Sequence, residues 1–199
     1  IVYLLTHMII KINDIDLRIL SLFTKGYNKE LYIREVQKLL GISSRTALVT
    51  LAKLENKGIL ESKKRGKIKI YSIKKRGISK EYFLLTEQYK KINFLEKNHL
   101  IKEIIEKLDD VLLGIVIIFG SYAKEIQKED SDLDILTIGK NDEDKIKEVS
   151  HRYGIEINIK SYPMEIFKKE INEDFLLKEV VENHIIIRGV EDFYERSKF

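Results

Sequence analysis

The sequence predicts an α+β protein with two domains joined by a helical connector. Its 199 residues suit one or two domains. Residues 1–80 carry 18 basic and 6 acidic side chains, whereas residues 81–199 carry 18 basic and 26 acidic ones. Helical periodicity dominates the first part, and a long apolar run followed by period-two alternation marks the second. A charge step of this size indicates two modules that face different partners.

The composition excludes several classes of protein. A hydrophobic share of 44% is normal for a globular chain and argues against a mainly disordered state. The chain has no cysteine, which excludes a disulfide scaffold, a thiolate zinc site and a cysteine nucleophile, so we expect a cytoplasmic location. No apolar run approaches the roughly 18 residues that cross a bilayer, so no membrane partner is expected. We interpret residues 1–7, which precede Met8, as a tag or leader outside the fold.

The first domain, which we place at residues 8–78, begins with helices in a helix-turn-helix layout. Gly41 is placed to end one helix, because glycine adopts positive φ without strain, and Ser43 or Ser44 is placed to cap the next. A turn of about four residues between two helices is typical of a helix-turn-helix unit. Apolar residues recur at helical spacing over three ranges, 14–23, 31–40 and 44–56.

A β-hairpin with a basic tip is predicted to follow these helices. Residues 67–71 alternate between polar and apolar side chains, which predicts a strand with one buried face. Residues 61–80 hold nine Lys or Arg and one Glu. Three helices and this hairpin, over about residues 12–76, resemble a winged helix-turn-helix domain of the bacterial and archaeal regulator type.

This resemblance implies that the first domain binds double-stranded DNA. The start of the third helix would meet base edges in the major groove, and the basic hairpin would neutralise phosphates. The alternative is that the lysines form only a solvated face and that the helices dock another partner. We favour DNA binding, and the residues expected to contact DNA are Ser44, Arg45, Thr46, Thr50, Lys53, Lys63, Lys64, Arg65 and Lys67.

Residues 79–109 are predicted to form the helical connector. They contain no glycine or proline, and their apolar residues recur at helical intervals with a break near Lys97-Asn98. One interpretation is a single long helix or two stacked helices that pack on the second domain. The other is the interface of a homodimer, because helix-turn-helix proteins commonly read two half-sites as pairs. The periodicity fits both interpretations, and a homodimer is expected.

The second domain, which we place at residues 110–199, is predicted to bring two aspartates together. Residues 112–119 form a continuous apolar run, which suits a strand that is buried on both faces. Asp132 lies eleven residues after Ser121 and begins a second, alternating strand. Asp132 and Asp134 then share one face of that strand, because side chains alternate. Two such carboxylates can hold one Mg²⁺ ion.

Gly120-Ser121 followed by Asp132-x-Asp134, each at the edge of a strand, resembles the signature of the nucleotidyltransferase (DNA polymerase β-like) superfamily. The resemblance implies a small mixed-sheet domain in which Asp132 and Asp134 hold Mg²⁺ (or Mn²⁺). It further implies that Gly120, Ser121 and Lys124 bind the phosphates of an NTP, since glycine lets backbone N–H groups approach phosphate closely. The alternative is that Gly120-Ser121 is only a helix cap and that the aspartates lie at a solvated strand edge.

A third carboxylate and two departures from the family pattern complete the expected site. In the family this carboxylate lies on a neighbouring strand, and the alternating stretch 154–160 offers Glu156; the alternative is that Glu156 is a simple exposed residue. The family continues Gly-Ser-x-Ala-Arg-Gly, whereas this chain has Lys124 and Glu125. Lysine keeps the positive charge without the bidentate fork of arginine. Glu125 would repel a triphosphate if its side chain pointed inward.

Together the two resemblances predict a winged helix fused to a nucleotidyltransferase domain over about residues 12–190. We expect a DNA-binding transcriptional regulator that binds Mg-NTP and transfers NMP to a hydroxyl, with Asp132, Asp134 and Glu156 as catalytic residues. One alternative is a transferase of the toxin–antitoxin type, which acts on a protein, or a transferase that acts on a small molecule. The other is a catalytically inactive scaffold for ligand sensing or dimerisation.

Overall fold

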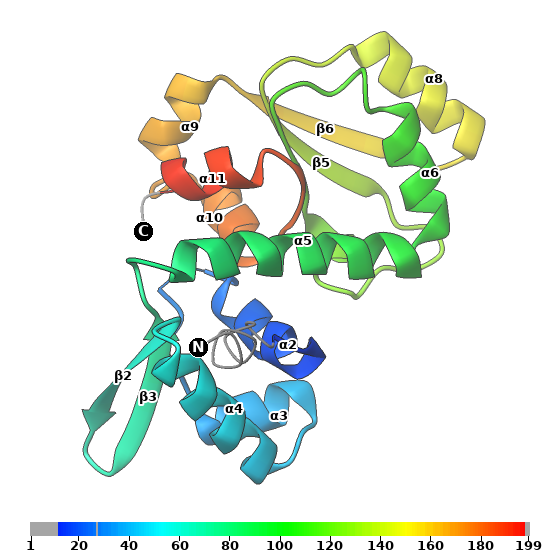
Figure 1. The fold of residues 1–199 in the computed structure, drawn as a ribbon. Helices are drawn as coiled ribbons and strands as arrows, with labels where there is room; N and C mark the ends of the chain where they lie inside the picture. Colours follow the sequence, from blue (N-terminus) through cyan, green and yellow to red (C-terminus); the bar gives the residue numbers. More distant parts are fainter. Residues whose placement is uncertain (1–11, 27, 198–199) are drawn as a thin grey trace, which may run out of the picture.

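Two groups of elements lie on opposite sides of one long helix, α5 (Ser79–Lys97), in the computed structural model (Figure 1). The structure describes residues 12–26 and 28–197, so the expected leader 1–7 lies outside the described residues. Three helices and a small sheet form one group, and a four-stranded sheet with its covering helices forms the other. Among the described helices, none is long and apolar enough to cross a membrane.

The first group is a winged helix-turn-helix domain. Gly41 ends one helix with φ of 63°, and the Ser43 side chain accepts a hydrogen bond from the Thr46 N–H at the start of the next. The expected helix at 31–40 begins two residues late, because Leu31 and Tyr32 pair with strand β3 instead. The helices are α2 (Asp14–Phe23), α3 (Ile33–Leu40) and α4 (Ser44–Asn56), and the sheet, in the order β1-β3-β2, is formed by β1 (Leu31–Tyr32), β2 (Leu60–Arg65) and β3 (Ile68–Ile73).

The connector is two helices, and it belongs to the cores of both groups. α5 ends at Asn98, where the sequence predicts a break, and α6 (His99–Lys107) follows. α5 packs against α2 on one side and against β7 (Ile185–Arg188) and α11 (Val190–Arg196) on the other. Buried apolar residues therefore form one cluster that runs from α2 to the four-stranded sheet. This shared core holds the winged helix against the second domain.

The second domain is a mixed four-stranded sheet, in the order β6-β5-β4-β7, with helices on both faces. Only β5 and β6 are parallel. The apolar residues of one sheet face cluster with α6 and α8, and those of the other face cluster with α9, α10 and α11. The predicted strand at 112–119 is shorter than expected. The elements are β4 (Ile115–Ile118), α7 (Gly120–Ala123), β5 (Leu133–Ile138), α8 (Glu143–Tyr153), β6 (Ile157–Tyr162), α9 (Met164–Glu170), α10 (Phe175–Glu182), β7 (Ile185–Arg188) and α11 (Val190–Arg196).

A buried polar cluster centred on two residues of α5, Glu87 and Lys90, joins the two domains. Lys90 Nζ donates to both carboxylate oxygens of Glu87, at 2.9 and 2.8 Å, and to Thr24 Oγ1 of the winged helix at 3.2 Å. His184 Nε2 lies 3.4 Å from Glu87 Oε2, and its Nδ1 contacts the carbonyl of Val180 in α10. Burial opposes ionisation of Glu87, but the charge of Lys90 and the contact with His184 outweigh it and lower the pKa of Glu87 to about 2. His184 directly precedes β7 (Ile185–Arg188) and is buried.

Candidate functional site

The two aspartates lie side by side at the start of β5. Leu133 and Ile135 are buried on one face of the sheet, and Asp132 and Asp134 occupy the other, where they are half-buried. Asn158 on the neighbouring strand β6 pairs in register with Asp134. Its Nδ2 lies 3.3 Å from Asp132 Oδ2 and 3.5 Å from Asp134 Oδ1. One amide nitrogen therefore reaches both carboxylates, so the two acidic groups face a common point.

The bend after Phe119 forms the floor beneath Asp134. The Phe119 N–H donates to the Asp134 carbonyl at 3.0 Å, which fixes the end of β4 against the start of β5. Gly120 has φ of +68°, and a Cβ added to it would lie only 2.1 Å from Asp134 Oδ2. A side chain at this position would thus displace the carboxylate. Ser121 follows in the short helix α7 and is half-buried.

Crowding of negative charge shapes the electrostatics of this face. Burial raises the pKa of the Asp134 carboxyl, and the charges of Asp132 and of Glu179 on α10 raise it further. The hydrogen bond from Asn158 and the charge of Lys160 act in the opposite direction. A bound cation would relieve the repulsion between these carboxylates, because opposite charge favours the ionised form.

Glu156 is not gathered with the two aspartates as a third acidic group. Within the described residues, no group of three or more His, Cys, Asp and Glu side chains lies close enough together to hold a metal ion. Glu156 precedes β6, its carbonyl accepts the Leu133 N–H at 2.8 Å, and its side chain is exposed. Asn158, two residues later on the same face, lies beside the aspartates instead. The alternating pattern puts both residues on one face, but only the strand register distinguishes them.

The two departures from the family pattern have different environments. Lys124 Nζ forms an ion pair with Glu179 Oε1 at 2.5 Å, so α10 supplies a partner for the expected phosphate-binding lysine. Glu125 adopts φ of 56°, the left-handed conformation that glycine adopts without strain. Its side chain is 74% exposed and lies 3.5 Å from Lys97 of α5, so it does not point at the aspartates.

The start of α4 presents part of the expected DNA-contacting set to solvent. Ser44 and Arg45 are exposed, and Thr46 is half-buried with its hydroxyl 2.8 Å from that of Ser43. Of the other two α4 residues expected to contact DNA, Thr50 does not face solvent, and Lys53 is partly exposed but already paired. Thr50 is only 6% exposed, and Lys53 Nζ binds the buried carboxylate of Asp16 at 2.5 Å. Thr50 lies on the inner side of α4, and Lys53 lies at the edge of that side, where its ion pair with Asp16 holds α4 against α2.

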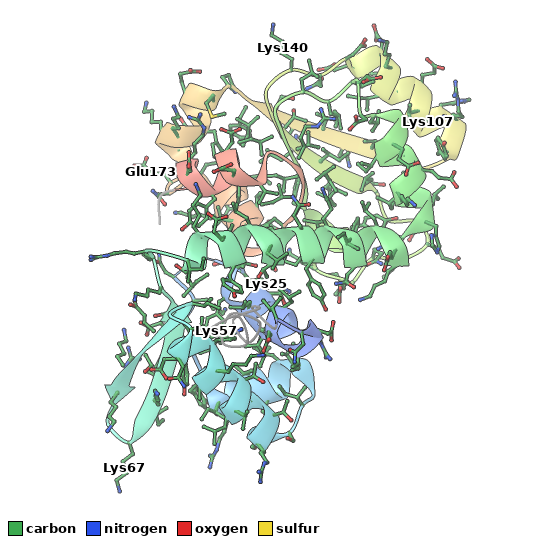
Figure 2. The ribbon with its side chains drawn as sticks, in the orientation of Figure 1. Lys25, Lys57, Lys67, Lys107, Lys140 and Glu173 are labelled. Carbon is green, nitrogen blue, oxygen red and sulfur yellow. The ribbon has the colours of Figure 1, made fainter. Side chains whose placement is uncertain are left out.

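The hairpin presents its basic residues unequally. Lys63 and Arg65 both form ion pairs with Glu30, which lies before β1. Lys64 and Lys67 are exposed, and neither forms an ion pair with another described residue. Lys67 projects from the tip of the hairpin, away from the rest of the protein (Figure 2). Lys64 and Lys67 are therefore the tip lysines available to a phosphate backbone.

Three residues near the aspartates lay outside the predicted site: Asn158, Lys160 and Glu179. The first two share the face of β6 with Glu156, and the alternation of that strand could have included them. Glu179 lies 55 residues after Lys124 on a helix whose amphipathic pattern gives no sign of a polar role. No local signal in the sequence places it beside the bend.

Comparisons with known proteins found family models that match each of the two parts of the chain. A family model described as "Polymerase beta, Nucleotidyltransferase" matches residues 81–191, and one described as "Winged helix-turn-helix DNA-binding" matches residues 12–61. Two proteins of Methanocaldococcus jannaschii are similar to this chain. "Putative protein adenylyltransferase MJ0141" is 34% identical over 105 residues, which cover 49% of this chain and 99% of the relative. "Putative protein adenylyltransferase MJ0604" is 37% identical over 82 residues, which cover 38% and 82%.

One solved structure aligns with most of the chain at low similarity. It is TrmBL2, described as an archaeal chromatin protein that shows a novel mode of DNA binding. The alignment covers 89% of this chain and 73% of TrmBL2, with 18% sequence identity and a TM-score of 0.30. This likeness is too low to support an inference about either domain.

Proposed function

Because the chain belongs to the polymerase β nucleotidyltransferase family and carries a winged helix-turn-helix DNA-binding domain, we propose that it is a DNA-binding regulator that transfers AMP from ATP to a protein hydroxyl. The names of the two similar proteins support this choice of nucleotide and acceptor. The observation that carries the proposal is the placement of Asp132 and Asp134 together against Gly120.

The donor set suits a divalent metal. Two carboxylates whose charges repel one another meet at a common point, and Mg²⁺ is commonly held by one or two carboxylates together with substrate phosphates. Asp132 and Asp134 would hold Mg²⁺ or Mn²⁺. Bound there, the ion would neutralise the charge that develops on the phosphates during transfer.

In the proposed reaction, the acceptor oxygen forms a bond to the α-phosphorus of ATP. The bond from that phosphorus to the oxygen that bridges to the β-phosphate breaks, and pyrophosphate leaves. Gly120 and Ser121 would bind the phosphates, and Lys124 would reach them by exchanging Glu179 for phosphate oxygens. Glu156 is proposed to accept the hydroxyl proton; because it is exposed just before β6 and is not gathered with the aspartates, this role requires the acceptor to approach from that end of the sheet.

The transfer is tested with ATP labelled at either the α- or the γ-phosphorus. The protein is incubated with labelled ATP, Mg²⁺ and a cell extract, and label on protein bands is measured. Of the label that depends on the added protein, we expect all to come from α-labelled ATP; it is expected to be lost in Asp134→Asn and retained in Asp130→Asn, which removes an exposed carboxylate close by. Equal labelling by the two variants, or γ-label whose transfer depends on the added protein, would exclude the proposed reaction.

A second candidate function is favoured by Asn158. An amide lies where the family places a third carboxylate, which suits a domain that binds nucleotide as a sensor without transferring it. Asn158→Asp separates the two candidates. The protein is a sensor if the wild type binds ATP without transferring AMP and Asn158→Asp gains transfer. Transfer of AMP by the wild type would exclude the sensor function.

For the winged helix, we propose that Ser44, Arg45 and Thr46 meet base edges and that Lys64 and Lys67 contact phosphates. The exposure of these residues at the start of α4 and at the hairpin tip supports this assignment. Binding to duplexes of random sequence, selected over several rounds, tests it. Arg45→Ala is expected to relax sequence preference, whereas Lys67→Ala is expected to weaken binding to all duplexes alike. A preference that is unchanged in Arg45→Ala would exclude base contact by this residue.

A further inference from the structure

We propose that the cleft between the winged helix and the nucleotidyltransferase domain is an effector site for a small, multiply phosphorylated molecule. The cleft has a volume of about 890 Å³, which is within the range of small-molecule sites. One wall is formed by residues 25–26 and 28–31 and by α3, and the other by α10 and the residues on either side of it. This site is separate from the aspartate pair, and it would exist whether or not the domain transfers AMP.

Four lysines give the cleft its binding chemistry. Lys25, Lys29 and Lys38 line the winged-helix wall, and Lys178 of α10 lines the opposite wall. All four are exposed, and none forms an ion pair with another residue in the part of the chain that the structure describes. Unpaired ammonium groups on facing walls suit phosphate, which binds lysine through charge-assisted hydrogen bonds.

The acidic residues of the cleft do not cancel this charge. Glu30 already binds Lys63 and Arg65 of the hairpin. Glu35 accepts a hydrogen bond from the Tyr32 N–H at 3.0 Å, as part of the cap of α3. Glu182 is the one other carboxylate among the described lining residues. The cleft therefore keeps an excess of positive charge.

The remaining lining suits a ligand with an organic part. The side chains of Asn172 and Asn183 offer amide donors and acceptors, and Leu39 and Val181 offer apolar surface. A phosphorylated molecule with a ring, such as a nucleoside polyphosphate, would use both kinds of contact. Inorganic phosphate chains would use the lysines alone.

The cleft lies at the junction of the two domains, so a ligand bound there would affect how they are held together. At its edge, the Gly26 N–H donates to the Val181 carbonyl at 3.2 Å, a direct bond between the two domains. A ligand that contacts Lys29 and Lys178 at once would strengthen this junction. α3 precedes the DNA-contacting helix α4, and α10 carries Glu179, the partner of Lys124. The effector would thus act on both proposed activities.

The test is calorimetric titration of the full chain with inorganic triphosphate in the absence of divalent metal. Lys29→Ala with Lys178→Ala removes one charge from each wall. Lys107→Ala with Lys147→Ala is the matched control, because both of these lysines are exposed and outside the cleft, with Lys107 on the far side of the second domain (Figure 2). We expect the cleft variant to weaken binding about tenfold or more and the control to leave it nearly unchanged.

The proposal would be overturned by one result with Asp134→Asn and by three results with the other proteins. The three are no binding by the wild type at millimolar triphosphate, equal weakening in the cleft variant and the control, and a cleft variant that loses affinity for DNA but not for triphosphate. Asp134→Asn separates this test from the proposed transfer, since it is expected to lose transfer and to keep triphosphate binding. Loss of triphosphate binding in Asp134→Asn would place the ligand at the aspartates and would likewise refute the cleft site.

Discussion

Replacing Gly120 by alanine is predicted to disable the proposed transfer site while the fold survives. Gly120 has φ of +68°, and this conformation costs an L-residue roughly 1–2 kcal/mol. The added Cβ would lie 2.1 Å from Asp134 Oδ2, whereas real Cβ contacts stay beyond 3.0 Å, so the carboxylate must move by about 0.9 Å. A displacement of about 1 Å at a reacting centre can cost about 100-fold in rate.

Gly154→Ala is the matched control for this substitution. Gly154 has φ of +65°, and a Cβ added there meets nothing within 4 Å. Urea unfolding is expected to show a similar loss of about 1–2 kcal/mol in both variants. The rate of transfer from α-labelled ATP is expected to fall about 100-fold in Gly120→Ala only. Equal transfer rates in the two variants would refute the claim that the packing of Asp134 on Gly120 sets the activity.

Three further predictions concern stability and DNA binding. Glu125→Gly is expected to raise the free energy of unfolding by about 0.5–1 kcal/mol in urea, because it removes a left-handed non-glycine residue, and a decrease would contradict this account. The lowered pKa of Glu87 means that its contribution to stability is complete above its ordinary value of 4.5 and is lost as the pH falls toward about 2. Glu87→Gln is expected to lower the free energy of unfolding by about 3–5 kcal/mol near neutral pH and to make that free energy depend less on pH below 4.5. If urea unfolding shows the same dependence on pH in the variant as in the wild type, Glu87 does not stabilise the buried cluster in this way. Lys64→Ala with Lys67→Ala is expected to reduce the slope of log affinity for DNA against log salt concentration by about 1.8. Lys53→Ala is expected to leave this slope unchanged, because Lys53 binds Asp16. A reduction in Lys53→Ala equal to that in the double variant would place Lys53 at the DNA.

The parts of the fold that depend on local sequence follow the predictions closely. Gly41 ends α3 because positive φ is required there, and the connector breaks at Asn98, where its apolar spacing is interrupted. The alternation around Asp134 correctly assigns each side chain to a face of β5. In each case the cause lies within a few residues of its effect, so a sequence pattern can reveal it.

The parts that the sequence did not reveal depend on distant partners. Lys53 occupies a position on α4 that could face either way, and Asp16, 37 residues earlier, draws it inward. Lys124 meets Glu179 only because α10 covers the aspartate face of the sheet. The choice between Glu156 and Asn158 depends on the register of β6 against β5, which one alternating strand cannot specify.

The proposed transfer requires Asp132 and Asp134 to hold one metal ion between them, and that ion can be located by crystallography. Crystals grown with Mn²⁺ and a non-hydrolysable ATP analogue would show the ion by its anomalous scattering. We expect a peak between the two carboxylates, with the triphosphate against Gly120 and Ser121. A peak elsewhere in the domain, or an analogue bound away from that bend, would contradict this expectation.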